Sequence, residues 1–250
     1  MEIKWIVTED DIRNVLEFFG AHRENPWVSD REKRNLGWTG DEVSKEQFWQ
    51  ELVTCLLTTQ QRSGPDSPVC RFANTKPFPL SYSACESSGD VEAFAVDELT
   101  RFGGLRRHKS IAHEVAVNFD VMERGLWQET SEKIRQLGEK RDAAAEREVA
   151  DFIDDRYLGF GPKQSRNLLQ ALGLTLYEIP IDSRVTKWLN EFGFPVAISA
   201  TMLSDRDYYH FVLDGFQHLC ERAGVYPCLL DGAIFASHDP GKWTADKVGW

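Results

Sequence analysis

Lys163 and Asp182 are the residues of this sequence best placed to do chemistry. Lys163 ends the segment Gly-Phe-Gly-Pro-Lys at residues 159–163, and Asp182 follows nineteen positions later. A neutral lysine amine is a nucleophile, and a carboxylate can accept a proton or stabilise developing positive charge. Because an ordinary lysine has a pKa of about 10.4, the fold must lower the pKa of Lys163. We expect burial and the positive end of a helix to do so.

The segment around Lys163 has the pattern of two helices joined by a hairpin. Apolar residues recur at helical spacing before and after it. Gly159 and Gly161 permit a tight turn, and Pro162 suits the first turn of the second helix. Backbone N–H groups there could bind a phosphate. A corner between helices without a ligand would also explain the glycines, and Asp182 could simply cap the next helix.

The rest of the sequence is also mostly helical in its apolar spacing, and alternating strand patterns are nearly absent. We therefore predict an all-α fold. Residues 176–181 alone have extended character, and residues 139–148 have the charge pairs of a solvated helix. Loops are predicted over 23–39, 63–68, 74–90 and 238–242. Helices are predicted over 11–19, 44–59, 109–121, 131–137, 146–157, 163–172, 183–192 and 205–223.

The composition is that of an ordinary globular protein, with a net charge of −11 over 250 residues. This charge argues against binding a polyanion. However, residues 156–187 carry five basic and two acidic side chains, and residues 101–112 carry four basic side chains and no acidic one. The sequence shows no apolar run long enough to cross a membrane and no signal-peptide pattern, and its five cysteines form no C-x-x-C pair. We expect an intracellular protein of the cytoplasm or nucleoid.

Residues 159–163 and 181–182 together resemble the hairpin and aspartate signature of the helix-hairpin-helix DNA glycosylases of the endonuclease III superfamily. The type 2 8-oxoguanine DNA glycosylases are the most similar branch. Residues 56–61, 103–111 and 230–235 match further family segments in the same order. The resemblance implies two helical subdomains with a DNA-binding cleft between them. Residues 45–177 would form a six-helix barrel with the hairpin, and residues 1–44 plus 178–250 would form the second subdomain.

The resemblance also implies a reaction in base excision repair. A lysine at the position of Lys163 attacks C1′ of a damaged nucleotide, expels the base and leaves a Schiff base, from which β-elimination cuts the strand. Asp182 would stabilise positive charge on the sugar. The protein would then be a bifunctional DNA glycosylase and AP lyase for an oxidised base such as 8-oxoguanine, acting as a monomer on damaged double-stranded DNA. Two alternatives remain: a monofunctional glycosylase of alkylated bases, and a non-catalytic DNA-binding hairpin module.

Further residues are assigned by the same resemblance. Gln60 or Gln61 would fill the space left by the flipped base. The other candidates for DNA contact are Gly159, Gly161, Arg166 and Arg184, and those for the base pocket are Trp49, Phe102, Asp231, Phe235 and Trp250. Trp250 stands where the type 2 enzymes have a terminal lysine. We expect no cofactor, because His218, Cys220 and Cys228 match no zinc spacing and the four-cysteine loop of an iron–sulfur cluster is missing.

Overall fold

The computed structural model describes residues 4–238 and 243–244, and within these ranges the secondary structure is entirely helical. The predicted all-α fold is confirmed. The helices are α1 (Glu9–His22), α2 (Pro26–Arg31), η1 (Glu32–Leu36), α3 (Lys45–Leu57), α4 (Pro68–Ala73), α5 (Tyr82–Ser87), α6 (Val91–Phe102), α7 (His108–Val121), η2 (Met122–Leu126), α8 (Trp127–Glu139), α9 (Ala143–Arg156), α10 (Pro162–Ala171), α11 (Ser183–Phe192), η3 (Met202–Ser204), α12 (Arg206–Ala223) and α13 (Pro227–Ser237).

Helix starts follow the capping chemistry of the sequence. The Ser44 hydroxyl accepts a hydrogen bond from the Gln47 N–H (3.1 Å) at the start of α3, the helix that the apolar spacing predicted over 44–59. The short helices α2 and α4 each begin with a capping side chain followed by proline. They were missed, as were α5, α6 and α13. In particular, α2 and α5 lie inside segments that were predicted to be loops.

The charged run at residues 139–148 is not one solvated helix. The helix α8 ends at Glu139, Lys140 is extended, and α9 begins at Ala143. Glu146 is fully buried, and its carboxylate accepts hydrogen bonds from the N–H groups of residues 176, 177 and 178 at 2.7–2.9 Å. Its burial raises the pKa of Glu146 to about 7. Residues 176–181 form no strand, and the Glu146 side chain rather than a neighbouring strand accepts from the N–H groups of three of them.

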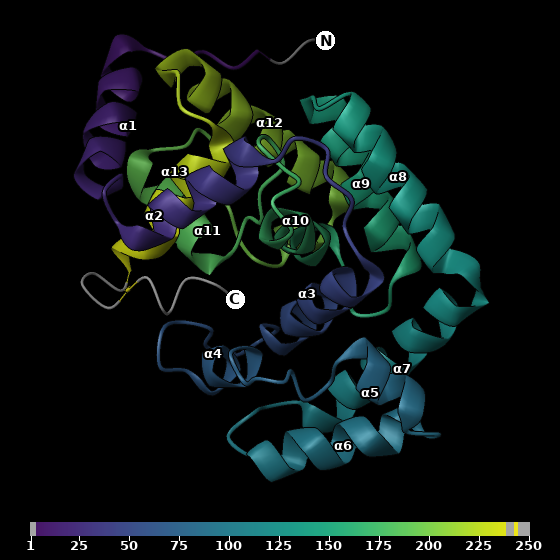
Figure 1. Cartoon of the computed structure of the whole chain (residues 1–250). Coiled ribbons are helices and arrows are strands. Elements are labelled where there is room, and N and C mark those ends of the chain that lie inside the picture. The colour runs from purple at the N-terminus through teal and green to yellow at the C-terminus, as the bar shows by residue number, and fades with distance from the viewer. Residues whose placement is uncertain (1–3, 239–242, 245–250) are drawn as a thin grey trace.

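Two large hydrophobic cores organise the chain. One draws its buried residues from 43–174, and the other from Val15 and residues 179–234. In Figure 1, α4 to α7 lie at the bottom, α1, α2, α11 and α13 lie at the upper left, and α3 and α10 lie in the middle. The extended segment after α10 joins the cores. The exact division at residue 177 stays a prediction.

A buried ion-pair cluster crosses the boundary between the cores. Arg166 and Glu178 are both fully buried, and Arg166 Nε lies 2.7 Å from Glu178 Oε2. Arg166 Nη2 also lies 2.9 Å from Asp151 Oδ1, and Arg147 Nε lies 3.0 Å from Glu178 Oε1. The charged groups that pair with Arg166 therefore hold its side chain in the protein interior. Its predicted contact with DNA is wrong, because no part of its side chain reaches solvent.

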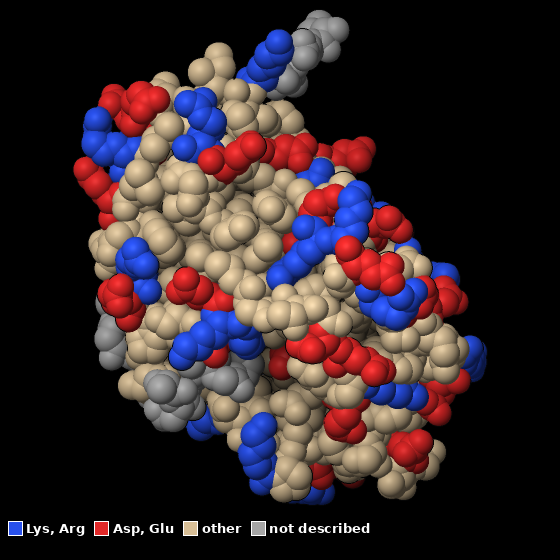
Figure 2. Space-filling view, turned by 45° about the horizontal axis from the view of Figure 1, so that its top comes forward, with Lys and Arg blue, Asp and Glu red and all other residues tan. Residues whose placement is uncertain are grey.

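The surface carries both signs of charge. Figure 2 shows lysine and arginine side chains interspersed with aspartate and glutamate, separated by uncharged surface. On this face no broad patch of one sign is formed among the residues drawn in colour. None of the helices within residues 4–238 is both long enough and apolar enough to span a bilayer.

Candidate active site

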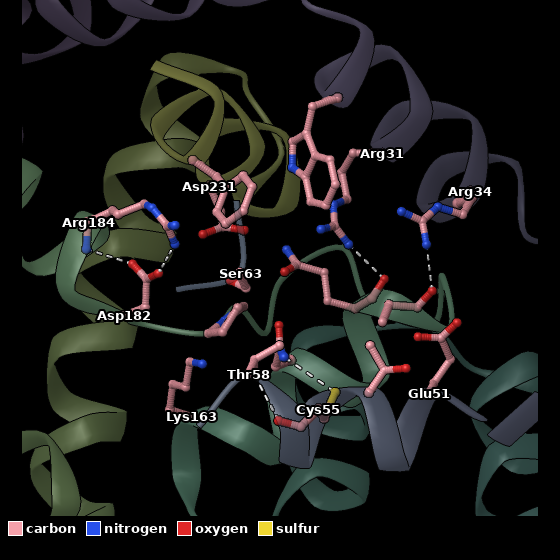
Figure 3. Close-up of a pocket in the computed structure, with 17 residues that line it drawn as sticks. Arg31, Arg34, Glu51, Cys55, Thr58, Ser63, Lys163, Asp182, Arg184 and Asp231 are labelled. Atoms are coloured by element: carbon pink, nitrogen blue, oxygen red, sulfur yellow. Dashed lines mark hydrogen bonds and ion pairs between the residues drawn. The ribbon is translucent and has the colours of Figure 1, made fainter. Parts of the chain in front are cut away.

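A narrow cavity lies where α2, α3, α10, α11 and α13 meet, and its volume is about 70 Å³. It adjoins a wider, open groove of about 780 Å³. Thr58, Ser63, Lys163, Asp182 and Arg184 line both spaces, so they form the mouth of the cavity. The structure thus brings the two residues singled out from the sequence, Lys163 and Asp182, to one opening (Figure 3).

Lys163 lies in the first turn of α10, directly after Pro162. Its Nζ donates a hydrogen bond to Gln164 Oε1 (2.9 Å). Lys163 is half-buried, and desolvation by burial lowers the pKa of its amine. The carboxylate of Asp182 opposes the shift, and the guanidinium of Arg184 adds to it. The lowering of the Lys163 pKa by burial is the effect expected from the sequence.

Gln164 connects this lysine to the end of α3. Its Nε2 donates hydrogen bonds to the carbonyl oxygen of Cys55 (2.6 Å) and to Thr59 Oγ1 (2.7 Å). Because the Gln164 amide is held in this way, its Oε1 is fixed as the acceptor for Lys163. No pattern in the sequence indicates this role, because a glutamine in a helix is ordinary.

Asp182 is the N-cap of α11. Its Oδ1 accepts hydrogen bonds from the N–H groups of Arg184 (2.7 Å) and Val185 (3.1 Å), and its Oδ2 accepts one from Arg184 Nη1 (2.8 Å). The capping role considered for Asp182 is confirmed, and it fixes the carboxylate at the mouth of the cavity. The Arg184 guanidinium also lies 4.2 Å from the centre of the Phe235 ring. Arg184 is held, yet it lines the open groove.

Asp231 and Arg31 occupy the inner part of the cavity. Each is 6% exposed. Burial raises the pKa of Asp231 to about 7, the nearby Asp182 adds to this shift, and Arg31 opposes it. Burial lowers the pKa of Arg31 to about 10, so Arg31 stays charged at neutral pH. Phe235, which stacks on Trp27 with ring centres 4.7 Å apart, completes an aromatic wall.

The two hairpin glycines have different roles. Gly159 has φ +86°, and a Cβ there would lie 2.7 Å from Leu56 Cδ2, so packing requires a glycine at this position. Gly161 is the N-cap of α10 and has no side chain to bind the first N–H groups of that helix. Both Gly161 and Lys163 line the groove, so the start of α10 faces it.

Gln60 and Gln61 both line the groove, but only the Gln61 side chain is held by the hydrogen bonds given below. Gln60 is exposed and has φ +56°. Gln61 accepts a hydrogen bond from the Arg106 N–H (2.8 Å) through Oε1, and its Nε2 donates to the carbonyl oxygen of Leu57. Gln60 is therefore the better placed of the two to enter a duplex.

Two aromatic residues predicted for the base pocket lie elsewhere. Trp49 is fully buried in the first core, where its Nε1 donates to the carbonyl oxygen of Leu80 (2.8 Å). Phe102 packs edge-on against Phe72, with ring centres 5.0 Å apart. Neither lines the cavity, so both predictions are wrong. Trp250 lies outside the described residues.

Other cavity residues were not found from the sequence. Arg31 and Trp27 come from α2, which was predicted to be a loop, and Gln170 comes from the far end of α10. Nothing in their local pattern indicates a site. Within residues 4–238 and 243–244, no three His, Cys, Asp or Glu side chains are grouped so as to hold a metal ion. The lack of a cofactor stays a prediction.

The chain matches no protein-family model and no curated protein in sequence. Its structure is similar to solved DNA glycosylases. The 8-oxoguanine DNA glycosylase of Methanocaldococcus jannaschii is 15% identical, with a TM-score of 0.62 over 92% of this chain and 96% of that one. The corresponding enzyme of Thermotoga maritima is 16% identical, with a TM-score of 0.59 over 91% and 97%.

The M. jannaschii glycosylase/lyase in complex with a 15mer DNA containing 8-oxoguanine is also similar. It is 13% identical, with a TM-score of 0.65 over 92% of this chain and all of that one. At these identities the likeness establishes the fold. The fold expected from the sequence resemblance is therefore confirmed.

Proposed function

We propose that this protein is a DNA repair glycosylase that removes a damaged base through a Schiff base on Lys163 and then cleaves the abasic strand. The observation that carries the proposal is the position of Lys163. Its amine, with a pKa lowered by burial, stands at the mouth between a narrow cavity and an open groove. A nucleophile there can reach a sugar whose base enters the cavity while the strand stays in the groove.

The groove supplies the means to hold such a substrate. A base inside a duplex must be flipped out before its glycosidic bond can be attacked, and a side chain fills the space that it leaves. The uncapped start of α10 at Gly161 can bind a strand phosphate through backbone N–H groups. Gln60 is the side chain proposed to enter the duplex. The similar M. jannaschii enzyme, solved with DNA containing 8-oxoguanine, makes that oxidised base the first substrate to test.

The proposed reaction uses two residues. The neutral Lys163 amine attacks C1′, and the bond from C1′ to the base breaks with its electron pair going to the base. Asp182 stabilises positive charge that develops on the sugar. The nitrogen then loses a proton, and its electron pair forms the C=N bond as the C1′–O4′ bond breaks and O4′ takes up a proton. Loss of a proton from C2′ drives β-elimination, which breaks the C3′–O3′ bond and releases the 3′ strand. We propose that a monomer carries out both steps on damaged double-stranded DNA inside the cell.

Borohydride trapping tests this reaction directly. Reduction of the imine joins the protein covalently to an 8-oxoguanine duplex or to a duplex with a preformed abasic site. Lys163→Gln should abolish the adduct while keeping the fold. Lys33→Gln is the matched control, because Lys33 is exposed on η1 and should leave trapping unchanged.

Each other outcome favours a different function for this protein. An undiminished adduct with Lys163→Gln would remove Lys163 from the reaction. Base release by the wild type without any adduct would favour a monofunctional glycosylase, in which Asp182 activates water. Binding with neither release nor adduct, across oxidised and alkylated bases, would favour a non-catalytic DNA-binding module.

A further inference from the structure

Arg31 places a buried positive charge at the inner end of the cavity. It lies at the end of α2 and is 6% exposed. Its Nη1 donates a hydrogen bond to the carbonyl oxygen of Gln170 (2.8 Å), and its Cζ lies 5.6 Å from the centre of the Trp27 ring. Figure 3 shows the Arg31 side chain reaching from α2 into the cavity that Asp231 also lines.

Two donors at this end of the cavity lack a partner within the described part of the chain. They are the buried Arg31 Nε and the buried Gln170 Nε2. The Gln170 amide lies close enough to Asp231 to lower the pKa of that carboxyl, but its Nε2 makes no hydrogen bond of good geometry. A buried donor without an acceptor costs about 1–3 kcal/mol. The cavity is therefore built to receive an acceptor.

Asp231 adds an acceptor to the same wall. No ion pair joins it to Arg31 among the described residues, so its carboxylate and the Arg31 guanidinium face the cavity separately. Donors beside an acceptor match a ring that carries a carbonyl oxygen next to an N–H. Guanine, its 8-oxo form, uracil and thymine have such an edge, whereas adenine and cytosine have exocyclic amino groups in place of one of these carbonyls.

We propose that Arg31 donates to a carbonyl oxygen of the flipped base and stabilises the negative charge that this base carries as it leaves. The inference rests on the proposed glycosylase function and names the class of base, one with a lactam edge, together with the residue that recognises it. Asp231 accepts the neighbouring N–H of the same edge.

The charge balance of the step explains why a cation is useful at that position. When the bond to C1′ breaks, the electron pair stays on the base and delocalises onto its carbonyl oxygen. A fixed guanidinium that is itself 6% exposed stabilises that charge more than solvent would. The base then takes up the proton that the Lys163 nitrogen releases, so the base departs neutral and Arg31 remains protonated throughout.

Arg34 provides a matched control for the structural part of the role of Arg31. Its Nη1 donates to the carbonyl oxygen of Ala171 (2.8 Å), one residue beyond the acceptor that Arg31 uses. Both arginines therefore tie the α2–η1 segment to the end of α10. The charge of Arg34, however, is paired with Asp30 at 2.6 Å. Arg34→Gln therefore removes a similar hydrogen bond to the end of α10, but the positive charge that it removes is already paired with Asp30.

The test separates base release from chemistry on a site that has no base. Single-turnover release from an 8-oxoguanine duplex and trapping on a preformed abasic-site duplex are measured for Arg31→Gln, Arg31→Lys and Arg34→Gln. Loss of one charge-stabilising donor typically slows catalysis by about 100-fold to 1,000-fold, so Arg31→Gln should slow release on the order of 100-fold. Abasic-site trapping should stay close to that of the wild type.

The remaining variants show whether Arg31 acts in base release or only in stabilising the fold. Arg31→Lys keeps a cation and should restore part of the release rate, and Arg34→Gln should slow release far less than Arg31→Gln. Unchanged release by Arg31→Gln, or release and abasic-site trapping that fall in parallel, would overturn the inference. Failure of the wild type to trap an abasic site would instead overturn the proposed Schiff-base function, so the two failures are distinguishable.

Discussion

Replacing Arg166 by methionine tests whether this arginine stabilises the fold or binds DNA. Methionine keeps an extended apolar side chain and removes the charge. In the protein, Arg166 Nε lies 2.7 Å from Glu178 Oε2, Nη2 lies 2.9 Å from Asp151 Oδ1, and Nη1 donates to the carbonyl oxygen of Pro162 at 3.0 Å. All of these contacts are lost together in Arg166→Met.

The expected loss of stability follows from these contacts. Removing one partner of a buried ion pair costs about 3–5 kcal/mol, because the other charge is left uncompensated. Glu178 keeps its contacts with Arg147 (3.0 Å) and Gln217 (3.1 Å), which places this cost near the lower limit. The lost bond to Pro162 adds about 1 kcal/mol. We expect the free energy of unfolding to fall by roughly 4 kcal/mol, a large part of the 5–15 kcal/mol typical of a folded protein.

Urea denaturation measures this loss, with Arg156→Met as the matched control. Arg156 is half exposed and pairs with Glu129 at 2.7 Å on the surface, so its replacement should cost less than about 1 kcal/mol. For folded Arg166→Met, the dependence of DNA affinity on salt concentration should match that of the wild type. A loss below about 1 kcal/mol, together with a logarithmic salt slope shallower by about 0.9, would refute this reasoning and return Arg166 to the DNA surface.

Two further substitutions test the hairpin and the inner cavity. Gly159→Ala forces a side chain into a positive-φ conformation and against Leu56, so it should lower the free energy of unfolding by at least about 2 kcal/mol and Tm by roughly 4–8 °C. The control is Gly20→Ala in α1, where a Cβ meets open space and the change should be neutral or stabilising. Equal melting temperatures of the two variants would contradict the close packing at Gly159. Burial raises the pKa of Asp231 to about 7, so the stability that its proton confers is complete below about pH 4 and is lost as pH rises through 7. The free energy of unfolding of the wild type, measured relative to that of Asp231→Asn, should therefore fall by up to about 1.4 kcal/mol per pH unit between pH 4 and 7. If the free energies of unfolding of the two proteins change in parallel with pH, Asp231 is not the titrating group.

The long helices could be predicted because their stability depends on a local pattern. The apolar spacing predicted α3 to within two residues at its end. The six-residue helices α2 and α5 are too short to show a period, and their stability comes from packing against distant elements such as α13 and α3. Only the folded chain reveals those contacts.

The same distinction applies to the site. Lys163 and Asp182 were found because the hairpin and the following cap are encoded within a short stretch. Arg31 was not, since its position in the cavity depends on a carbonyl group 139 residues away. Arg166 and Trp49 were assigned wrongly because a basic or an aromatic side chain has the same identity on a surface, in a pocket and in a core. Their partners decide the role, and those partners are set by the tertiary fold.

Two glutamine side chains brace one wall of the groove. Gln164 ties the start of α10 to the end of α3, and Gln61 ties the loop after α3 to the residue Arg106 before α7. The opposite wall, residues 181–186 and 200–204, is attached to the other core. Lys163 therefore lies on a wall that packs with the first core, whereas Asp182 lies on a wall that packs with the second. The distance between the amine and the carboxylate is thus set by how the two cores pack against each other, and the buried pair of Arg166 and Glu178 lies at that boundary.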